Sequence, residues 1–397
     1  MRSSGWLLCS SAGLALSLFA AARLPAQGNF FELPASRAEL EQRAVRDSND
    51  PAAHYNVALA LWNDEEYARA QTELRLAVKL DPRFALAHLA LACLPYSERT
   101  GLWNDIWGNK LTPEWQRRLR ESDREFSRAL MIDPLVDFSV ARLMVPPRNI
   151  FTYMFDFIAE WYDHYEQGYR DFYEGRYGDA EHHLGRLIRE ASRQDRLPAA
   201  LLRYHGLAAA HLGHYDAAIA DFAVLLGRSE RQEHSDSIQH FMLNTSEYRY
   251  IIGFLEQKAG RADTAQALYQ QAAEEDAGLF MAHVHLADLY EAHGVVGAAA
   301  AERANAVNIA PDDGSLWLDL GLTLYRSGRL REAEAALTQG RTVNPRDARL
   351  AYVFGLTEIA LDRPDVAREA LAGAIALAPV RYAQLIADAR QRLATLH

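Results

Sequence analysis

The sequence predicts an all-α protein, an α-solenoid built from stacked helix-turn-helix repeats. One pattern recurs four times without a gap over residues 246–381, in copies that start at Ser246, Phe280, Gly314 and Ala348. Each start lies 34 residues after the last, and a fixed period near this value is the signature of a helical repeat array. A hydrophobic content of 49% with only 14 prolines excludes a disordered chain.

The copy at residues 314–347 shows the pattern most clearly. Small residues let two helices approach closely, and large residues of the neighbouring helix fill the remaining space. A proline ends the second helix because it lacks an N–H and biases the preceding residue away from the helical conformation. The residues that carry these roles are Trp317, Leu320, Gly321, Leu324, Ala333, Leu337 and Pro345.

The N-terminus is typical of a secretory signal peptide, at residues 1–26. Arg2 precedes an uncharged apolar run at residues 6–22, and small-residue cleavage sites end at Ala22 and Ala26. We expect cleavage and an exported protein, periplasmic or extracellular, in the cell envelope, with no membrane span after cleavage. The alternative is a retained membrane anchor, although the run is slightly short for a span of about 20 residues.

The rest of the chain is taken in order. We predict a leader and N-terminal capping helix at 27–50, two repeats at 51–136, an irregular insertion and the start of a long aromatic helix at 137–160, two repeats at 161–232, a linker at 233–245, four contiguous repeats at 246–381, and a C-terminal capping helix at 382–397.

Two departures from the pattern are candidate functional segments. The second repeat contains 18 extra residues at 96–113, with Trp103 and Trp107, and the tryptophans favour a folded loop over surface decoration. Thr112 is a good N-cap for the helix that resumes there. A long helix at residues 148–173 carries two aromatic stripes where a surface helix needs only one.

The spacing of large, small and terminating residues resembles the tetratricopeptide-repeat family over most of residues 51–381. A second matching set, in the repeat that starts at Pro51, is Val57, Ala58, Leu61, Ala70, Leu74, Ala77 and Pro82. The departures, none of which breaks the register, are Ala277 for the terminal proline, Arg303 and Gly340 at packing positions, and Pro364. The resemblance implies a binding scaffold with a protein or peptide partner along a concave face formed by the first helices.

Family register also implies which residues face the concave groove. The predicted partner-binding residues are Tyr55, Asn56, Trp62, Asn63, Tyr162, Tyr165, Tyr169, Phe172, Tyr173, Arg203, Tyr204, Tyr250 and Phe254. Tyrosine and tryptophan bury a large area while keeping a polar tip, which suits a recognition surface. Lysine and arginine are sparse there, which disfavours a partner held by its terminal carboxylate. The alternative is that the tyrosines pack against the 137–160 insertion.

Composition and motifs limit the other functions. The net charge of −11 disfavours nucleic acid and anionic membranes as main partners. The sequence has no HExxH, phosphate-binding loop, nucleophile elbow or CxxC motif. We therefore expect no enzyme and no cofactor. Cys93 is the one cysteine outside the signal segment, and its apolar neighbours predict a buried, inert thiol.

Histidines recur at the fourth place of four repeats, as His54, His88, His164 and His283. A ladder of metal sites is one interpretation. We favour the other, in which each histidine replaces the packing aromatic of the pattern, because metal ligands must converge within about 2 Å of one ion. We expect no metal site.

Together these features predict a non-enzymatic protein- or peptide-binding scaffold with an aromatic concave groove. Two alternatives stay open. One is a structural subunit that docks through the loop at 96–113 or through the solenoid edge. The other is a small-ligand-binding or enzymatic protein that uses the tyrosine and histidine cluster.

Overall fold

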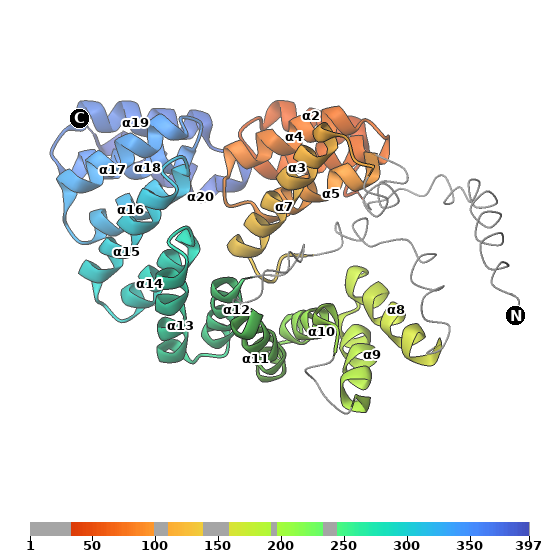
Figure 1. Cartoon of the computed structure of the whole chain (residues 1–397). Coiled ribbons are helices and arrows are strands. Elements are labelled where there is room, and N and C mark those ends of the chain that lie inside the picture. Colours follow the sequence, from red (N-terminus) through yellow and green to blue (C-terminus); the bar gives the residue numbers. More distant parts are fainter. Residues whose placement is uncertain (1–32, 99–109, 138–158, 192–196, 233–243, 397) are drawn as a thin grey trace, which may run out of the picture.

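The computed structural model describes residues 33–98, 110–137, 159–191, 197–232 and 244–396, with the backbone alone for residues 159–165 and 232. Within these ranges the regular secondary structure is helical, with no strand. Consecutive helices pack as hairpin pairs, and each pair packs on the next from α2 to α7 (residues 37–132) and again from α8 to α20 (residues 159–395) (Figure 1). The predicted all-α solenoid is therefore confirmed.

Most of the helices follow one another with short turns. In chain order they are α2 (Arg37–Arg46), α3 (Pro51–Asn63), α4 (Tyr67–Leu80), α5 (Ala85–Glu98), α7 (Pro113–Ile132), α8 (Ala159–Tyr173), α9 (Tyr177–Glu190), α10 (Ala199–His211), α11 (Tyr215–Gln232), α12 (Thr245–Lys258), α13 (Ala262–Glu275), α14 (Phe280–Ala292), α15 (Val296–Ile309), α16 (Gly314–Arg326), α17 (Leu330–Val343), α18 (Ala348–Ala360), α19 (Pro364–Leu377), the 3-10 turn Val380–Tyr382 and α20 (Ala383–Thr395).

A glycine at the eighth place of several repeats explains why the two helices of a pair approach so closely. A Cβ added to Gly321 would lie 2.5 Å from Leu337, and one added to Gly168 would lie 2.5 Å from Leu184. Ordinary contacts are about 3.5–4.0 Å, so only hydrogen fits at these places. The repeat at Pro51 uses Ala58, which is fully buried.

The turn between the helices of a pair needs a left-handed residue at its fifteenth place. Glycine takes this conformation without steric cost and occupies it in five repeats, as at Gly328 with φ of 76°. Glu65 and Asp362 occupy the equivalent place with φ of 61° and 60°. The repeat register thus continues through the two repeats that lack the glycine.

Both irregular segments lie partly outside the described residues. The structure assigns Tyr96 and its two successors to α5, so the first residues of the predicted 96–113 insertion are helical. Thr112 caps α7 as predicted, because its side chain accepts from the Trp115 N–H at 3.4 Å. Residues 99–109, with Trp103 and Trp107, and residues 138–158 lie outside the description, as do the signal segment and residues 233–243.

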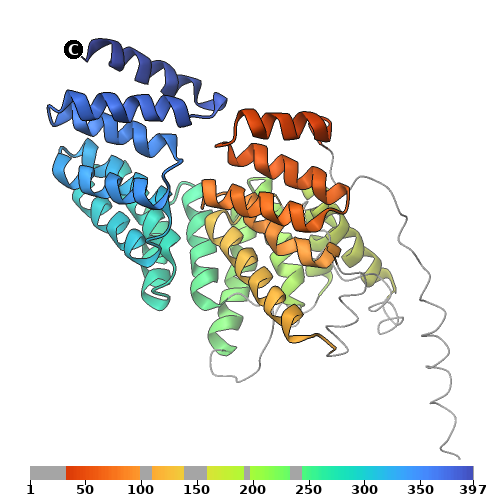
Figure 2. The ribbon, with the colours of Figure 1, turned by 90° about the horizontal axis from the view of Figure 1, so that it is seen from above.

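The array curves back until its first repeats lie against its last ones (Figures 1 and 2). The Asn49 side chain donates to the Leu377 carbonyl at 3.0 Å, and the Asn344 side chain donates to the Leu80 carbonyl at 3.1 Å. We call residues 33–98 and 110–137 the N-terminal block. This closure is the main feature of the fold that the repeat pattern does not contain.

One hydrophobic core cluster runs from Leu40 to Ala336 and includes residues of both the N-terminal block and the later repeats. Leu318, Leu337 and their neighbours form a second, smaller cluster. Cys93 is free and fully buried, as predicted, and burial raises the pKa of its thiol.

Candidate binding groove on the concave face

Aromatic side chains of α8 and α10 meet in one cluster. The rings of Tyr169 and Tyr204 lie 4.4 Å apart, and those of Phe172 and Tyr204 lie 5.0 Å apart. Tyr173 and Tyr204 share a hydrogen bond between their hydroxyls. Burial raises the pKa of both phenols, which keeps these hydroxyls protonated and able to donate. The structure thus brings together four of the residues predicted for the groove.

Tyr250 and Phe254 continue the aromatic face on α12. The Tyr250 hydroxyl donates to the Met131 carbonyl at 2.6 Å and lies 3.2 Å from Nε2 of His285. Burial, together with nearby positive charges, lowers the pKa of His285 to about 4, so this imidazole is neutral at physiological pH. The Lys258 ammonium lies 5.1 Å from the Phe254 ring centroid.

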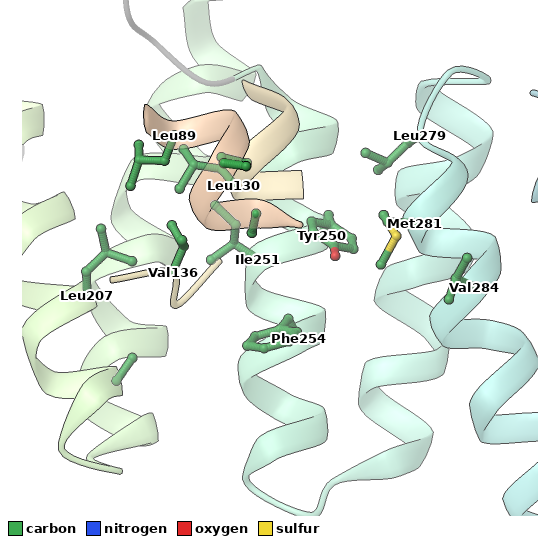
Figure 3. Close-up of a cluster of buried hydrophobic side chains, with 14 of the residues drawn as sticks. Leu89, Leu130, Val136, Leu207, Tyr250, Ile251, Phe254, Leu279, Met281 and Val284 are labelled. Carbon is green, nitrogen blue, oxygen red and sulfur yellow. The ribbon is translucent and has the colours of Figure 1, made fainter. Parts of the chain in front are cut away.

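The end of α7 and the turn after it already occupy this face. We call residues 130–137 the groove turn. Figure 3 shows Leu130 and Val136 facing Ile251 and Tyr250 of α12, with Leu207 of α10 on the other side. Val136 is 2% exposed. The closest apolar contacts of the groove are therefore made by the chain itself.

The groove turn has a compact backbone. The Leu135 N–H donates to the Asp133 side chain at 2.9 Å, and the Val136 N–H donates to the Asp133 carbonyl at 3.1 Å. The same two bonds form after α4, where Asp81 accepts from Arg83 and Phe84. The groove turn thus has the backbone of an ordinary turn between repeats, but it packs against helices that are distant in the sequence.

Two carboxylates of the groove turn face polar aromatic groups. His211 stacks on Tyr177 with ring centroids 3.9 Å apart, and its Nε2 has no hydrogen-bond partner within the described ranges. Burial lowers the pKa of His211, while the charges of Asp133 and Asp137 act in the opposite direction. Burial, followed by the charge of Asp137, raises the pKa of Tyr177 to about 12.

A second set of contacts, which we call the seam, joins the N-terminal block to later repeats, mostly through residues in turns and at helix ends. Arg83 pairs with Asp319 at 2.7 Å, and Arg381 pairs with Asp50 at 3.1 Å. Further seam contacts include Arg346 Nε to Asn49 Oδ1 at 2.6 Å, Val380 N to Asp47 Oδ2 at 3.1 Å, Arg128 to Asp313 at 3.6 Å, and the Arg128 guanidinium over the Phe280 ring at 4.3 Å. The seam is mostly polar, whereas the groove turn is mostly apolar.

The predicted groove was expected to be an open surface, and this needs correction. Trp62 and Phe172 are fully buried, Tyr250 is 2% exposed and Tyr173 is also buried, so their side chains belong to the core in this conformation. Tyr250 is covered by the groove turn of the N-terminal block, whereas Phe172 packs among the aromatic rings of its own and the next repeat. Contact of these residues with a partner stays a prediction.

The other predicted groove residues are only partly covered. Tyr55, Asn56, Asn63, Tyr169, Arg203 and Tyr204 are half-buried, whereas Phe254 is buried. Tyr55 packs on Phe84 with centroids 5.3 Å apart, and Arg203 donates to the Tyr248 hydroxyl at 3.3 Å. The side chains of Tyr162 and Tyr165 lie outside the description.

His54, His88 and His283 at the fourth place each contact a glutamate on the second helix of their repeat, while the side chain of His164 lies outside the description. His54 contacts the Glu73 carboxylate at 2.7 Å and the Ser48 carbonyl, six residues earlier, at 3.1 Å. His88 makes the matching pair of contacts. Trp317, at the same place, donates to the Pro311 carbonyl, also six residues earlier, at 2.8 Å. Among the described residues, no group of three or more His, Cys, Asp and Glu could hold a metal ion.

The groove turn and the seam are the contacts of this region that the repeat pattern does not reveal. Leu135 and Val136 are the available signal, because two apolar residues follow the terminal Pro134 where the regular pattern breaks. Of the helices that the structure describes, none combines the length and apolarity needed to cross a membrane.

Fold and groove together define an α-solenoid of helix-turn-helix repeats. Two family models of the tetratricopeptide repeat match the sequence, one at residues 165–233 and 318–382 and the other at residues 51–84. These matches identify tetratricopeptide repeats in this chain and support a scaffold for protein interactions. No curated protein sequence matches the chain.

Several solved structures are similar in part. The C-terminal part of a repeat-containing protein from Cytophaga hutchinsonii is 15% identical, covers 55% of this chain and 79% of its own, and has a TM-score of 0.43. YrrB, described as having an unusual peptide-binding site, is 18% identical over 52% of this chain and 97% of its own, with a TM-score of 0.38. MamA from Desulfovibrio magneticus is 18% identical over 47% of this chain and 97% of its own, with a TM-score of 0.37.

Proposed function

We propose that this protein is a non-enzymatic scaffold of the cell envelope that binds a protein or peptide through the aromatic concave face of α8, α10, α12 and α14. One observation carries the proposal: this face binds polypeptide within the molecule. Tyr250 donates to a backbone carbonyl of the groove turn, and apolar side chains enclose Leu130 and Val136. A surface that meets both the backbone and the side chains of a segment has the chemistry for peptide recognition.

The location in the envelope rests on the sequence. Arg2, the apolar run at residues 6–22 and the small-residue sites at Ala22 and Ala26 support a cleaved signal peptide. Peptide sequencing of the protein from fractionated cells tests this. We expect a mature N-terminus at residue 23 or 27, whereas an intact Met1 in the envelope fraction would contradict cleavage.

Partner capture from native envelopes tests the binding face. The double variant Tyr162→Ala with Tyr169→Ala removes two predicted groove tyrosines from α8, and we expect it to lose the partner while keeping its helicity. Tyr290→Ala is the matched control, because Tyr290 is half-buried and its hydroxyl bonds to Gln270 away from the groove turn. Equal capture by the double variant and the control would refute binding through this face.

A second function is favoured by the filled groove itself. Because the groove turn covers the concave face, a partner could dock on the loop at 96–113 or on the solenoid edge instead, with the protein acting as a structural subunit. Deleting residues 99–109 separates the two proposals. Loss of capture on deletion, with capture unchanged in the tyrosine variants, would favour the structural subunit.

A further inference from the structure

The groove turn is bound by residues that lie far from it in the sequence. The Tyr250 hydroxyl reaches the Met131 carbonyl over a separation of 119 residues. Leu130 and Val136 enter the apolar cluster between α10 and α12 (Figure 3). The contacts thus resemble those of a peptide ligand, one backbone hydrogen bond and two buried side chains, although the ligand is part of the same chain.

The contacts that hold the N-terminal block in place differ in kind from those inside a repeat. Along the seam they run between charged side chains that keep contact with water, such as Arg83 with Asp319, whose side chains are 22% and 23% exposed. Partly exposed ion pairs contribute little to stability and are screened by salt. Exposed seam pairs of this kind are therefore weaker than the apolar packing within the repeats, and opening of the seam would free the groove turn to leave α12.

We propose that the groove turn is an internal occupant of the binding groove, and that the partner is a peptide of the same chemistry that replaces it when the seam opens. This rests on the proposed function, in which the concave face binds polypeptide. The matching peptide has two aliphatic side chains flanking an acidic residue and a proline, as in residues 130–137. The apparent affinity for such a partner is reduced by the fraction of molecules that are closed.

The contacts that each residue of the groove turn makes indicate which chemical group a partner peptide needs at that place. The places of Leu130 and Val136 require aliphatic side chains. The Tyr250 hydroxyl requires a backbone carbonyl. Asp133 folds the segment by accepting from the Leu135 N–H, so an acidic or amide side chain before the proline preserves the turn.

Binding of a labelled peptide with the sequence of residues 128–137 tests the proposal by fluorescence anisotropy. In the full-length protein, Val136→Asp places a carboxylate in an apolar site and expels the groove turn. Val295→Asp is the matched control, because Val295 is 49% exposed in the turn between α14 and α15, outside the seam and the groove turn. We expect the Val136→Asp protein to bind the peptide about ten-fold more tightly than wild type, and the control to bind as wild type does.

A second variant shows whether tighter binding could result from misfolding of the Val136→Asp protein. Arg83→Gln with Arg346→Gln removes two seam contacts and leaves the groove and the groove turn unaltered. We expect it to bind the peptide more tightly than wild type as well, with unchanged helicity by circular dichroism. A peptide with aspartate in place of its valine is expected to bind none of the proteins.

The outcomes separate this inference from the proposed function. Equal and measurable affinity of wild type, Val136→Asp and the seam variant would overturn internal occupancy and leave peptide binding by the groove intact. No binding to any of the proteins would overturn the partner chemistry. Partner capture with the tyrosine variants would still decide the proposed function, because it does not use this peptide.

Discussion

Gly321→Ala tests whether the close packing of a helix pair requires glycine at the eighth place of the repeat. The new Cβ would lie 2.5 Å from both Cγ and Cδ2 of Leu337, which is fully buried in α17. This distance is shorter than a normal contact of about 3.5 Å, so α16 and α17 must move apart or Leu337 must leave its preferred rotamer. Either change costs about 1–3 kcal/mol of stability. Alanine returns up to about 1 kcal/mol through its helix propensity. We expect a net loss of about 1–2 kcal/mol.

Gly373→Ala is the matched control, because an added Cβ there meets no atom within 4 Å in the middle of α19. Only the higher helix propensity of alanine then changes the stability, and we expect the free energy of unfolding to rise by about 0.5–1 kcal/mol. Repeat arrays unfold in segments, so thermal melting is best combined with hydrogen exchange resolved to α16 and α17. If Gly321→Ala were as stable as Gly373→Ala, the assigned packing of the repeat would be refuted.

Two further variants test buried polar groups. Because burial lowers the pKa of His285 to about 4, its contribution to stability is complete above the unfolded pKa near 6.5 and is lost as pH falls toward 4. His285→Gln should remove about 2 kcal/mol of the stability difference between pH 7 and pH 5 in urea titrations, and an unchanged difference would contradict the assignment. Arg303 is 7% exposed and contacts Asp288 at 2.9 Å and Glu291 at 2.8 Å. Arg303→Met should cost about 3 kcal/mol at neutral pH, against almost nothing for the 71% exposed Arg331→Met, and similar losses would refute a structural role for the buried cation.

The repeats could be predicted from the sequence because their packing is local. Gly321 and Leu337 are 16 residues apart, and each repeat restates the same small and large pair. A second local contact also recurs from repeat to repeat. The side chain at the fourth place hydrogen-bonds to the carbonyl six residues earlier in the repeats of His54, His88 and Trp317. Periodicity fixes these contacts, so a single sequence is enough to find them.

Closure of the array could not be predicted in the same way. Asn49 and Leu377 are 328 residues apart, and most residues of the seam lie in turns or at helix ends, where polar side chains are ordinary. Periodicity indicates which face of a helix is apolar but not what covers it. For this reason the sequence predicts Tyr250 in a partner-binding groove but not that the groove turn covers it.

A covalent lock across the seam tests the central claim, that the groove is filled by the N-terminal block and must be vacated before a partner binds. Asn49→Cys with Arg346→Cys places two thiols where the native side chains meet, and a short bismaleimide can join them while the buried Cys93 stays unreactive. In the chain from residue 27, which lacks Cys9, the locked protein is compared with the same variant capped by N-ethylmaleimide.

The measurement is the affinity of each form for the peptide of residues 128–137. The capped protein can open, so it should bind the peptide about ten-fold or more tightly than the locked protein. Equal affinities of the locked and capped forms would show that the peptide site is accessible without opening of the seam, and would contradict the claim.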